Sequence, residues 1–428
     1  MKLFGKKKYP NGDRKYYFFG IPYLSKRRTS RHIRTYLFGL RTSKRSLTGG
    51  EYTVGMLKFD IMNYLEMKEI TKVPVKRNTV LFIEFLKWHA IVGGPIIWYF
   101  LELGYDVDIV MNTEGFIHEG FSCMDFPKDR VRVFNANPYV WWNQHFLENM
   151  LRYEWIFLNT GFYGDEIYYP AEFCKYYESV FHKSNMRFLF HSKSEELHKF
   201  PEELKDTLLD KMMVIFRFPV EGRKIPFVSP TKFGPCALEH KKNEITKFFF
   251  AGSFVTYKGQ KYRDQASLFD GLCQLVDNGA TDFKVVVISR DVPRDFEIPE
   301  KLRPFLEFRG ALTFPQMYRE LNDSDFMISA KNVIQMPEYL YDRASGDFGM
   351  SIGFAKPMVI QDEIAATQQL DDTTAVIHQG TSVYDALLRC INMTGKEYDE
   401  YVGNLKALRA RHQAESLENM RKVFGEAK

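Results

Sequence analysis

The fold is decided by the stretch VLFIEFLKWHAIVGGPIIWYFLELGYDVDIVM, residues 80–111. An apolar run of strand length, residues 80–85, leads into the glycine pair Gly93-Gly94 and then into an apolar helical pattern. A second apolar run, residues 107–111, follows directly. Two strands joined by a crossover of this length lie parallel in one sheet, with the helix against a face of that sheet. The stretch therefore predicts a βαβ unit and an α/β fold.

The same alternation continues through the first half of the chain. Further apolar runs of strand length recur at crossover spacing, at residues 131–134, 155–158, 186–190 and 212–216. Runs that are apolar throughout and separated by helical patterns are typical of a parallel sheet covered by helices. Four prolines and two glycines then interrupt residues 219–244, and we interpret this segment as a linker between two domains.

Beyond the linker the alternation restarts. Strands are predicted at residues 248–251, 283–289, 326–329, 358–360 and 375–377, with helices at about 263–276, 316–321 and 349–354. From residue 397 onward, apolar residues recur at helical spacing. We therefore predict four parts: a basic N-terminal arm at 1–50, a first domain at 51–225, a second domain at 226–394, and a terminal helical segment at 395–428 that packs back on the first domain.

Charge is distributed unevenly along the chain. The net charge is +5 over 428 residues, but residues 1–46 contain fourteen Lys or Arg and a single acid, Asp13. The arm therefore carries +13, and the rest of the chain −8. A basic arm favours a polyanionic partner, either an anionic membrane surface or nucleic acid. The aromatic residues within it favour the membrane interface; a third interpretation is a solvated, partly disordered leader.

Composition and cysteine usage narrow the class of protein. With 45% apolar and 26% charged residues, the chain falls in the ordinary globular range. Its five cysteines are dispersed without CxxC spacing, so neither a disulfide framework nor a zinc site is predicted, which fits a reducing cytoplasm. The longest uncharged apolar stretch, residues 88–101, is shorter than the ~20 residues that a spanning helix needs. We therefore expect no membrane span.

Three glycine-containing segments follow predicted strands, where ligands of parallel sheets usually bind. Backbone amides at a helix start, with a cation nearby, are suited to a phosphate or a sugar. The alternatives are a tight turn, a surface lysine and a helix start without a ligand. The candidates are Gly93 and Gly94 in the first domain and, in the second, Gly252, Ser253, Lys258, Arg343, Ser345, Gly346 and Asp347.

The order and spacing of these segments, across residues 80–392, resemble the nucleotide-sugar glycosyltransferases of the GT-B type, closest to the group 4-like family. The matching residues include Leu103-Gly104-Tyr105-Asp106-Val107, Lys258-Gly259, and Gly346 through Lys356-Pro357-Met358-Val359-Ile360. The resemblance implies two Rossmann-like doubly wound domains that face each other across a cleft. It implies a nucleoside diphosphate sugar on the second domain, an acceptor near Gly93-Gly94, and no cofactor.

The chain departs from that family at several positions. Ser253 stands where the family has a phosphate-binding arginine, so Lys258 would act with backbone amides or with another cation such as Arg263, Arg290 or Arg343. Gly346 and Phe354 occupy the places of the family's paired glutamates, and Asp347 replaces one of them only after a shift by one position. These departures leave the sugar donor open, and they allow a divergent or inactive member.

The resemblance also places the ends of two first-domain strands at the cleft. His191 is predicted to contact the transferring sugar or the acceptor hydroxyl, because a neutral imidazole accepts a proton near neutral pH. Asn159 and His118 are further catalytic candidates. The alternative for each is a polar residue that ends a strand or lies in a loop and is hydrogen-bonded for packing.

Together these features predict a glycosyltransferase that moves a sugar from a nucleoside diphosphate sugar to a lipid-linked or oligosaccharide acceptor. A precursor of lipopolysaccharide or capsule would be the natural acceptor. No metal is expected, because no Asp-x-Asp pair lies in a suitable loop, and the resemblance favours retention of configuration. The arm would hold the enzyme at the cytoplasmic face of the membrane. Two alternatives are another nucleotide-sugar enzyme, such as an epimerase, and a nucleic-acid-binding protein that acts through the arm.

Overall fold

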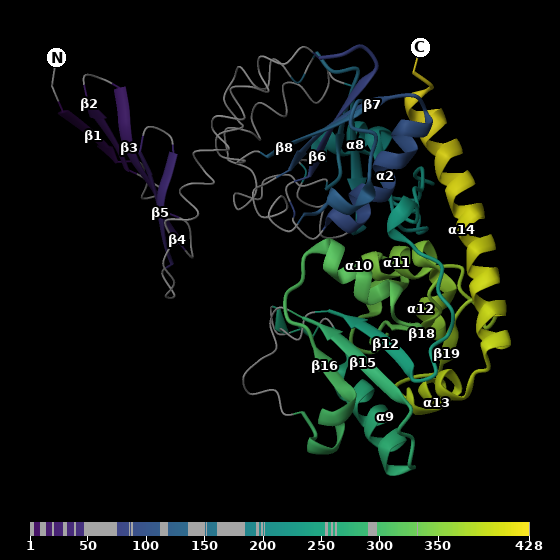
Figure 1. Ribbon diagram of the computed structural model, residues 1–428. Helices are drawn as coiled ribbons and strands as arrows, with labels where there is room; N and C mark the ends of the chain where they lie inside the picture. The colour runs from purple at the N-terminus through teal and green to yellow at the C-terminus, as the bar shows by residue number, and fades with distance from the viewer. Residues whose placement is uncertain are drawn as a thin grey trace.

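A computed structural model shows two α/β domains, each built on a parallel sheet of six strands (Figure 1). It describes residues 75–427 apart from 85, 87–88, 112–118, 136–149, 151, 161–184, 194–196, 198–199, 201, 253–255, 258–259, 262, 290–297 and 332. It also describes the backbone of five strands between residues 4 and 46. The expectation of two doubly wound α/β domains is confirmed.

The first sheet has the strand order β11-β10-β9-β6-β7-β8, and every neighbouring pair is parallel. Alternate residues of the central strand face different cores, since Phe82 lies in one and Leu81 in the other. Both faces of the sheet are therefore buried, which is why its strands are continuous apolar runs. The strands are β6 (Thr79–Glu84), β7 (Asp106–Met111), β8 (Val131–Asn135), β9 (Trp155–Leu158), β10 (Met186–Phe190) and β11 (Met212–Val214).

The second sheet has the order β16-β15-β12-β17-β18-β19 and is also parallel throughout. The sequence did not predict β16, because this edge strand is three residues long and its side chains stay partly exposed. The strands are β12 (Thr246–Ala251), β15 (Phe283–Ile288), β16 (Leu306–Phe308), β17 (Phe326–Ile328), β18 (Met358–Gln361) and β19 (Val376–His378). A small antiparallel pair, β13 (Thr256–Tyr257) and β14 (Gln260–Lys261), follows β12.

Helices cover the two sheets. Their starts follow ordinary capping chemistry: the Asp264 side chain accepts from the Ser267 amide at one of them, and Thr394 forms a capping box with Glu397 at another. The helices are α2 (Ala90–Glu102), α8 (Lys205–Lys211), α9 (Gln265–Asp277), α10 (Phe314–Asn322), α11 (Gly346–Phe354), α12 (Asp362–Thr367), α13 (Tyr384–Asn392) and α14 (Gly395–Phe424).

The last helix, α14, runs along both domains (Figure 1). It packs against α11 of the second domain and against α2 of the first. At its end, the Tyr105 hydroxyl donates to the Phe424 carbonyl at 2.7 Å, and the Ala427 amide donates to the Leu103 carbonyl at 2.9 Å. The Phe424 ring meets the Phe100 ring at a centroid distance of 4.9 Å. The C-terminus therefore fastens the second domain to the first.

The domains also meet where β10 ends. The Lys193 amide donates to the Asp342 carbonyl at 2.9 Å, and the Ala344 amide donates to the His191 carbonyl at 3.2 Å. The Ser192 hydroxyl donates to the Asp342 carboxylate at 2.8 Å. The segment that leads into α11 is therefore hydrogen-bonded to the carboxyl end of the first sheet.

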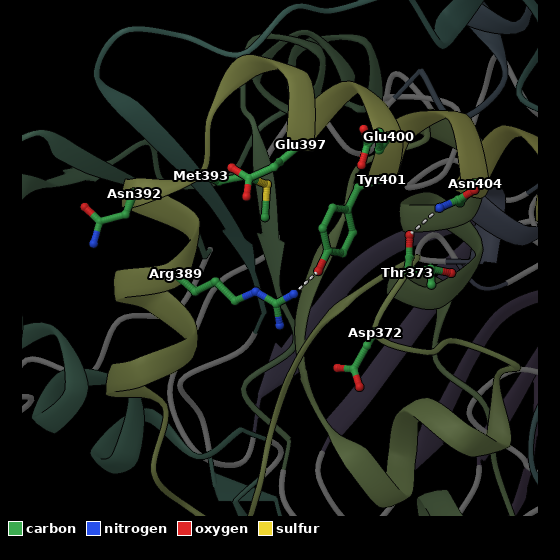
Figure 2. Close-up of a pocket in the computed structure, with 9 residues that line it drawn as sticks. All are labelled: Asp372, Thr373, Arg389, Asn392, Met393, Glu397, Glu400, Tyr401 and Asn404. Carbon is green, nitrogen blue, oxygen red and sulfur yellow. Dashed lines mark hydrogen bonds between the residues drawn. The ribbon is translucent and has the colours of Figure 1, made fainter.

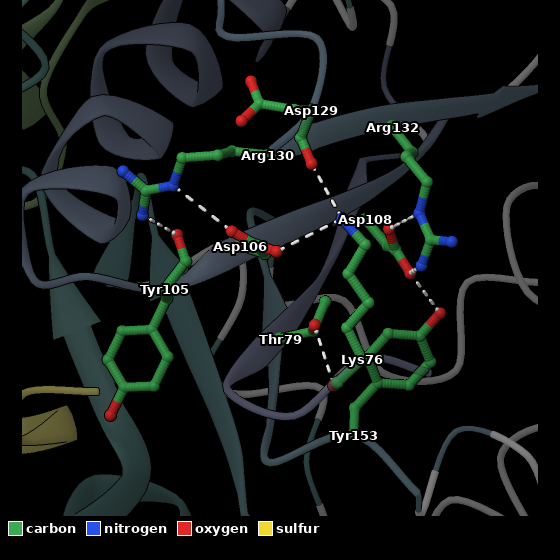
Figure 3. A network of polar contacts seen from close by, with 9 residues as sticks. All are labelled: Lys76, Thr79, Tyr105, Asp106, Asp108, Asp129, Arg130, Arg132 and Tyr153. Atoms are coloured by element: carbon green, nitrogen blue, oxygen red, sulfur yellow. Dashed lines mark hydrogen bonds and ion pairs between the residues drawn. The ribbon is translucent and has the colours of Figure 1, made fainter. Parts of the chain in front are cut away.

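A polar network ties the strands at the far edge of the first sheet (Figure 3). The Asp108 carboxylate, on β7, is buried, and it accepts two hydrogen bonds of 2.6 Å from the Arg132 guanidinium on β8. The Tyr153 hydroxyl donates to the same carboxylate at 2.7 Å. Asp106 binds Arg130 and Lys76 in the same way. Because both carboxylates are paired with cations from neighbouring segments, we interpret this network as one that holds the strands of the sheet together.

The basic N-terminal segment forms strands that the sequence did not predict. The backbone runs as an antiparallel sheet in the order β1 to β5, each strand paired with the next. The strands are β1 (Phe4–Lys8), β2 (Arg14–Phe18), β3 (Ile21–Arg28), β4 (His32–Leu37) and β5 (Leu40–Ser46). Within the described part of the chain, no helix has the length and apolarity that crossing a membrane requires.

Candidate active site

Polar side chains gather where three strands of the first sheet end. Glu84 is the last residue of β6, Asn159 and Thr160 follow β9, and His191 follows β10. His89 lies directly before α2. The carboxyl ends of parallel strands meet at one edge of a sheet, which is where ligands of doubly wound folds bind.

The Glu84 carboxylate is the centre of this group. It is 2% exposed, and it accepts hydrogen bonds from the Leu86 amide and from the Asn159 side-chain amide, both at 2.5 Å. The Thr160 hydroxyl donates to it at 3.2 Å. Three donors around a buried carboxylate offset the cost of removing its charge from water.

Two histidine rings stack beside this carboxylate. The rings of His89 and His191 lie 4.0 Å apart between centroids, at an interplanar angle of 17°. Nδ1 of His89 is 2.7 Å from the Thr160 hydroxyl, and Nε2 of His191 is 2.7 Å from the Asn159 carbonyl. Burial lowers the pKa of His191 to about 4. Burial, and then repulsion from His191, lower the pKa of His89 well below its usual range. Both rings are therefore neutral at physiological pH.

The glycine pair predicted to contact an acceptor lies inside helix α2, beside this group. Helix α2 begins at Ala90, so Gly93 and Gly94 are in its interior and both are buried. A Cβ atom on Gly94 would lie 2.3 Å from Cε of Met124, and one on Gly93 would lie 3.1 Å from the Asn159 amide nitrogen. Close packing within the helix therefore accounts for both glycines, and their contact with an acceptor stays a prediction.

A second group of charges lies at the start of α11. Lys331, which follows β17, is fully buried and forms an ion pair with Asp347, the second residue of α11. Arg263, which precedes α9, lies 3.3 Å from the same carboxylate oxygen. A Cβ atom on Gly252, directly after β12, would lie 2.7 Å from Nε of Arg263. A larger residue at this position would therefore displace the guanidinium. Two cations therefore share one carboxylate.

The electrostatics of this group follow from burial and pairing. Burial, and then the neighbouring Arg263, lower the pKa of Lys331 while Asp347 acts in the opposite direction, and the result is a pKa of about 7. Burial raises the pKa of Asp347, but the two cations outweigh it, so that the pKa is lowered overall. The Lys331 ammonium also lies 4.8 Å from the centre of the Phe348 ring. With Lys331 protonated, the group carries a net charge of +1.

The group has the features of an anion site. The free amides at the start of α11 carry a partial positive charge in the same place. Ser345 is the residue before this helix, and Gly346 is its first. An incoming anion would therefore find two cations and a helix start.

The remaining predicted residues are distributed as follows. Arg343 lies in the segment that pairs with Ser192 at the domain junction. Ser253, Lys258 and His118 lie outside the described residues. The sequence pointed to Asn159 and His191, and it named Arg263 as a substitute cation. It missed Glu84, His89, Thr160 and Lys331.

The two groups are connected through the domain junction. The Ile91 side chain, two residues beyond His89, contacts Gly346, because a Cβ atom on that glycine would lie 2.2 Å from Cδ1 of Ile91. On the other side, the His191 carbonyl accepts from the Ala344 amide, three residues before Asp347. His89 therefore lies two residues from a contact with the first residue of α11, and His191 is hydrogen-bonded to the segment that leads into this helix.

A pocket of about 450 Å³ lies away from these groups (Figure 2). It is formed between α13, α14 and the loop that contains Thr373. Its Arg389 guanidinium donates to the Tyr401 hydroxyl at 2.6 Å, and the lining also includes Asp372, Glu397 and Glu400. None of the residues of the two groups lines it, so we do not assign it to the active site.

No metal centre is found among the residues that the structure describes, because no three His, Cys, Asp or Glu side chains gather there in a suitable arrangement.

Comparisons with known proteins give structural likenesses alone. No family model and no curated protein matches the chain. A glycosyltransferase from Rickettsia africae is 11% identical, with a TM-score of 0.49 over 82% of this chain and 99% of its own. A putative UDP-N-acetylglucosamine 2-epimerase from Listeria monocytogenes is 9% identical, with a TM-score of 0.47 over 77% and 91%. At such sequence identities a similar fold does not establish a similar function, so a function can be proposed only from the residues of the site.

Proposed function

We propose that the chain is a glycosyltransferase that takes its sugar from a nucleoside diphosphate sugar. The observation that carries this proposal is the pairing of Lys331 and Arg263 with the single carboxylate of Asp347 at the start of α11. A site with one excess positive charge, fixed in a buried place, suits a diphosphate. Of the residues predicted to bind the sugar donor, Gly252, Gly346 and Asp347 belong to this site.

The chemistry of the leaving group supports the same assignment. When the glycosyl bond breaks, negative charge develops on the diphosphate oxygens. Cations and amides that are already in place stabilise this charge without reorganisation. Lys331 is held by Asp347 and by the Phe348 ring, so its position does not depend on a bound ligand.

The acceptor would bind on the side of the first domain. There His89, His191 and Asn159 are neutral groups that can accept or donate hydrogen bonds to a hydroxyl. Contact between Ile91 and Gly346 keeps this side next to the proposed diphosphate site. Transfer would therefore take place at the domain junction.

We further propose that the acceptor is a lipid-linked or oligosaccharide precursor of a cell-surface glycan, and that the protein works at the cytoplasmic face of the membrane. The support is the charge of the N-terminal segment, +13 over residues 1–46. Anionic lipids attract such a segment by about 1 kcal/mol for each cation near the surface.

Hydrolysis of sugar donors tests the proposed activity. The full chain is incubated with UDP-glucose, UDP-N-acetylglucosamine, GDP-mannose and ADP-glucose, and release of the nucleoside diphosphate is measured. We expect slow hydrolysis of one donor, and a loss of at least tenfold in Lys331→Gln. The matched control is Lys301→Gln, because Lys301 is 41% exposed and pairs with Asp277, away from the proposed site.

Three results would decide against the proposal in different ways. A folded protein that is inert toward every donor contradicts it. An epimerised nucleotide sugar in place of free diphosphate shows an epimerase instead. Equal activity of Lys331→Gln and the control would show that the diphosphate does not bind at the proposed site.

A further inference from the structure

We propose that His89 is the group that takes the proton from the acceptor hydroxyl, and that Thr160 and Glu84 position it for that step. The inference rests on the proposed glycosyl transfer and adds a residue that the sequence did not indicate. It starts from the chain of contacts from the Glu84 carboxylate through the Thr160 hydroxyl to Nδ1 of His89.

The direction of these hydrogen bonds follows from a count of protons. The ionised Glu84 carboxylate can only accept hydrogen bonds, as it does from two N–H groups, so in its contact with Thr160 the hydroxyl is the donor. The Thr160 hydroxyl has one proton, and it gives that proton to Glu84. It can then only accept from His89. The ring proton of His89 is therefore on Nδ1, and Nε2 carries the lone pair.

His191 has the opposite tautomer. Its Nε2 lies 2.7 Å from the carbonyl oxygen of Asn159, which can only accept, so the proton of His191 is on Nε2. That proton is held by the backbone. Of the two stacked rings, His89 is the one whose tautomer, with the lone pair on Nε2, is fixed by the Glu84 carboxylate through Thr160.

The same arrangement keeps His89 neutral before the reaction and supports its charge afterwards. Burial and the adjacent His191 ring oppose protonation in the resting state. When a proton arrives at Nε2, the Glu84 carboxylate, linked through Thr160, is the negative charge that stabilises the imidazolium. A relay of this kind fixes tautomer and orientation, as in other carboxylate-supported histidine bases.

The step balances as follows. The acceptor hydroxyl gives its proton to Nε2 of His89, and its oxygen forms a bond to the anomeric carbon of the sugar. The bond from that carbon to the diphosphate oxygen breaks, and its electron pair leaves with the diphosphate near Lys331 and Arg263. Because the oxygen enters opposite the leaving group in a single displacement, the configuration inverts. This differs from the retention that the family resemblance favoured.

Location supports the assignment. His89 is two residues from Ile91, whose side chain contacts the first residue of α11. Asp347, which pairs with Lys331, is the next residue of that helix. The contact between Ile91 and Gly346 therefore links the two sites: His89 is two residues from Ile91, and Asp347 of the proposed diphosphate site is the neighbour of Gly346.

The test separates the proton-transfer step from binding of the sugar donor. UDP binding is measured by calorimetry, and turnover by hydrolysis of the donor that the wild-type protein accepts, with water as the acceptor. In His89→Gln we expect unchanged UDP binding and a fall in kcat of about 10²- to 10⁴-fold. Thr160→Val removes the hydroxyl at nearly constant shape, and kcat should fall at least tenfold. Thr160→Ser restores the hydroxyl and should recover most of the loss.

The anomer of the released sugar, recorded by NMR directly after mixing, is the second readout. Inversion is the expected result. Retention, or full kcat in His89→Gln with intact UDP binding, would overturn the assignment of His89. Absence of UDP binding in the wild-type protein would instead contradict the proposed function, so the two failures are distinguishable.

Discussion

Lys331 shows how a single buried side chain sets the charge of the proposed diphosphate site. Its ammonium is surrounded by the Asp347 carboxylate, the Arg263 guanidinium and the rings of Tyr339 and Phe348. Burial raises the pKa of Tyr339, so this phenol adds no charge at neutral pH. Since the pKa of Lys331 is about 7, the site loses its excess positive charge as the pH rises above that value.

The pH dependence of UDP binding should follow this titration. A bound diphosphate favours the ammonium form of Lys331, so at pH 8 binding should take up nearly one proton, and at pH 6 almost none. The affinity should fall as the pH rises above about 7. Calorimetry in two buffers of different ionisation enthalpy measures the proton uptake. Lys331→Met should abolish it, whereas tight binding without proton uptake at pH 8 would contradict the assignment of this lysine.

At the residue scale, the sequence predicted only some members of the candidate site. Glu84, which ends β6, and Lys331, which follows β17, were not singled out from the sequence. The available signal was an isolated charge at the carboxyl end of a buried strand, where a doubly wound fold places its ligands. His191 and Asn159 were predicted because the family resemblance placed the ends of their strands at the cleft. The contacts between Glu84, Thr160 and His89 join residues 71 or more positions apart, and no local pattern contains them.

At the scale of elements, the sequence predicted strands better than helix starts. The runs at 155–158 and 186–190 agree with β9 and β10, because a strand buried on both faces is apolar from end to end. Helix α2 begins at Ala90, before the glycine pair that suggested its start. A glycine that allows close packing and a glycine that binds a ligand have the same sequence pattern, and only the neighbour Met124 distinguishes them.

Glycines in α11 and α14 give a matched pair of substitutions. A Cβ atom on Gly349 would lie 2.8 Å from the Pro230 carbonyl oxygen, whereas one on Gly403 has no atom within 4 Å. Gly349→Ala should therefore destabilise the protein by about 1–3 kcal/mol through overpacking. Gly403→Ala should stabilise it by about 0.5–1 kcal/mol, because alanine favours the helix. Urea unfolding measures both, and shifts of the same sign would contradict the packing described for α11.

At the scale of the whole molecule, the chain combines two α/β domains, a helix that fastens them together, and a basic N-terminal segment. Phe424 at the end of helix α14, and Ala427 shortly after it, reach the first domain, so the two domains meet both at the candidate site and along this helix. The N-terminal segment concentrates the positive charge, and the rest of the chain carries −8. We infer that the segment localises the protein and the junction of the domains carries out the reaction.

Vesicle binding tests the role of the N-terminal charge. The full chain should sediment with vesicles that contain phosphatidylglycerol and not with pure phosphatidylcholine, because the attraction is electrostatic. Salt should release the protein, since exposed charges are screened at a distance of about 3 Å in 1 M salt. Equal binding to both vesicles would contradict the proposed localisation, and salt-sensitive binding to DNA alone would favour the nucleic-acid alternative.

The most direct test of the central claim is a crystal structure of the full chain with UDP. We expect the diphosphate within hydrogen-bond distance of Nζ of Lys331 and of the Arg263 guanidinium, at the start of α11. The same structure would contradict the account if the diphosphate lay instead in the pocket beside Arg389, or if UDP were bound with Lys331 and Asp347 still paired and out of its reach.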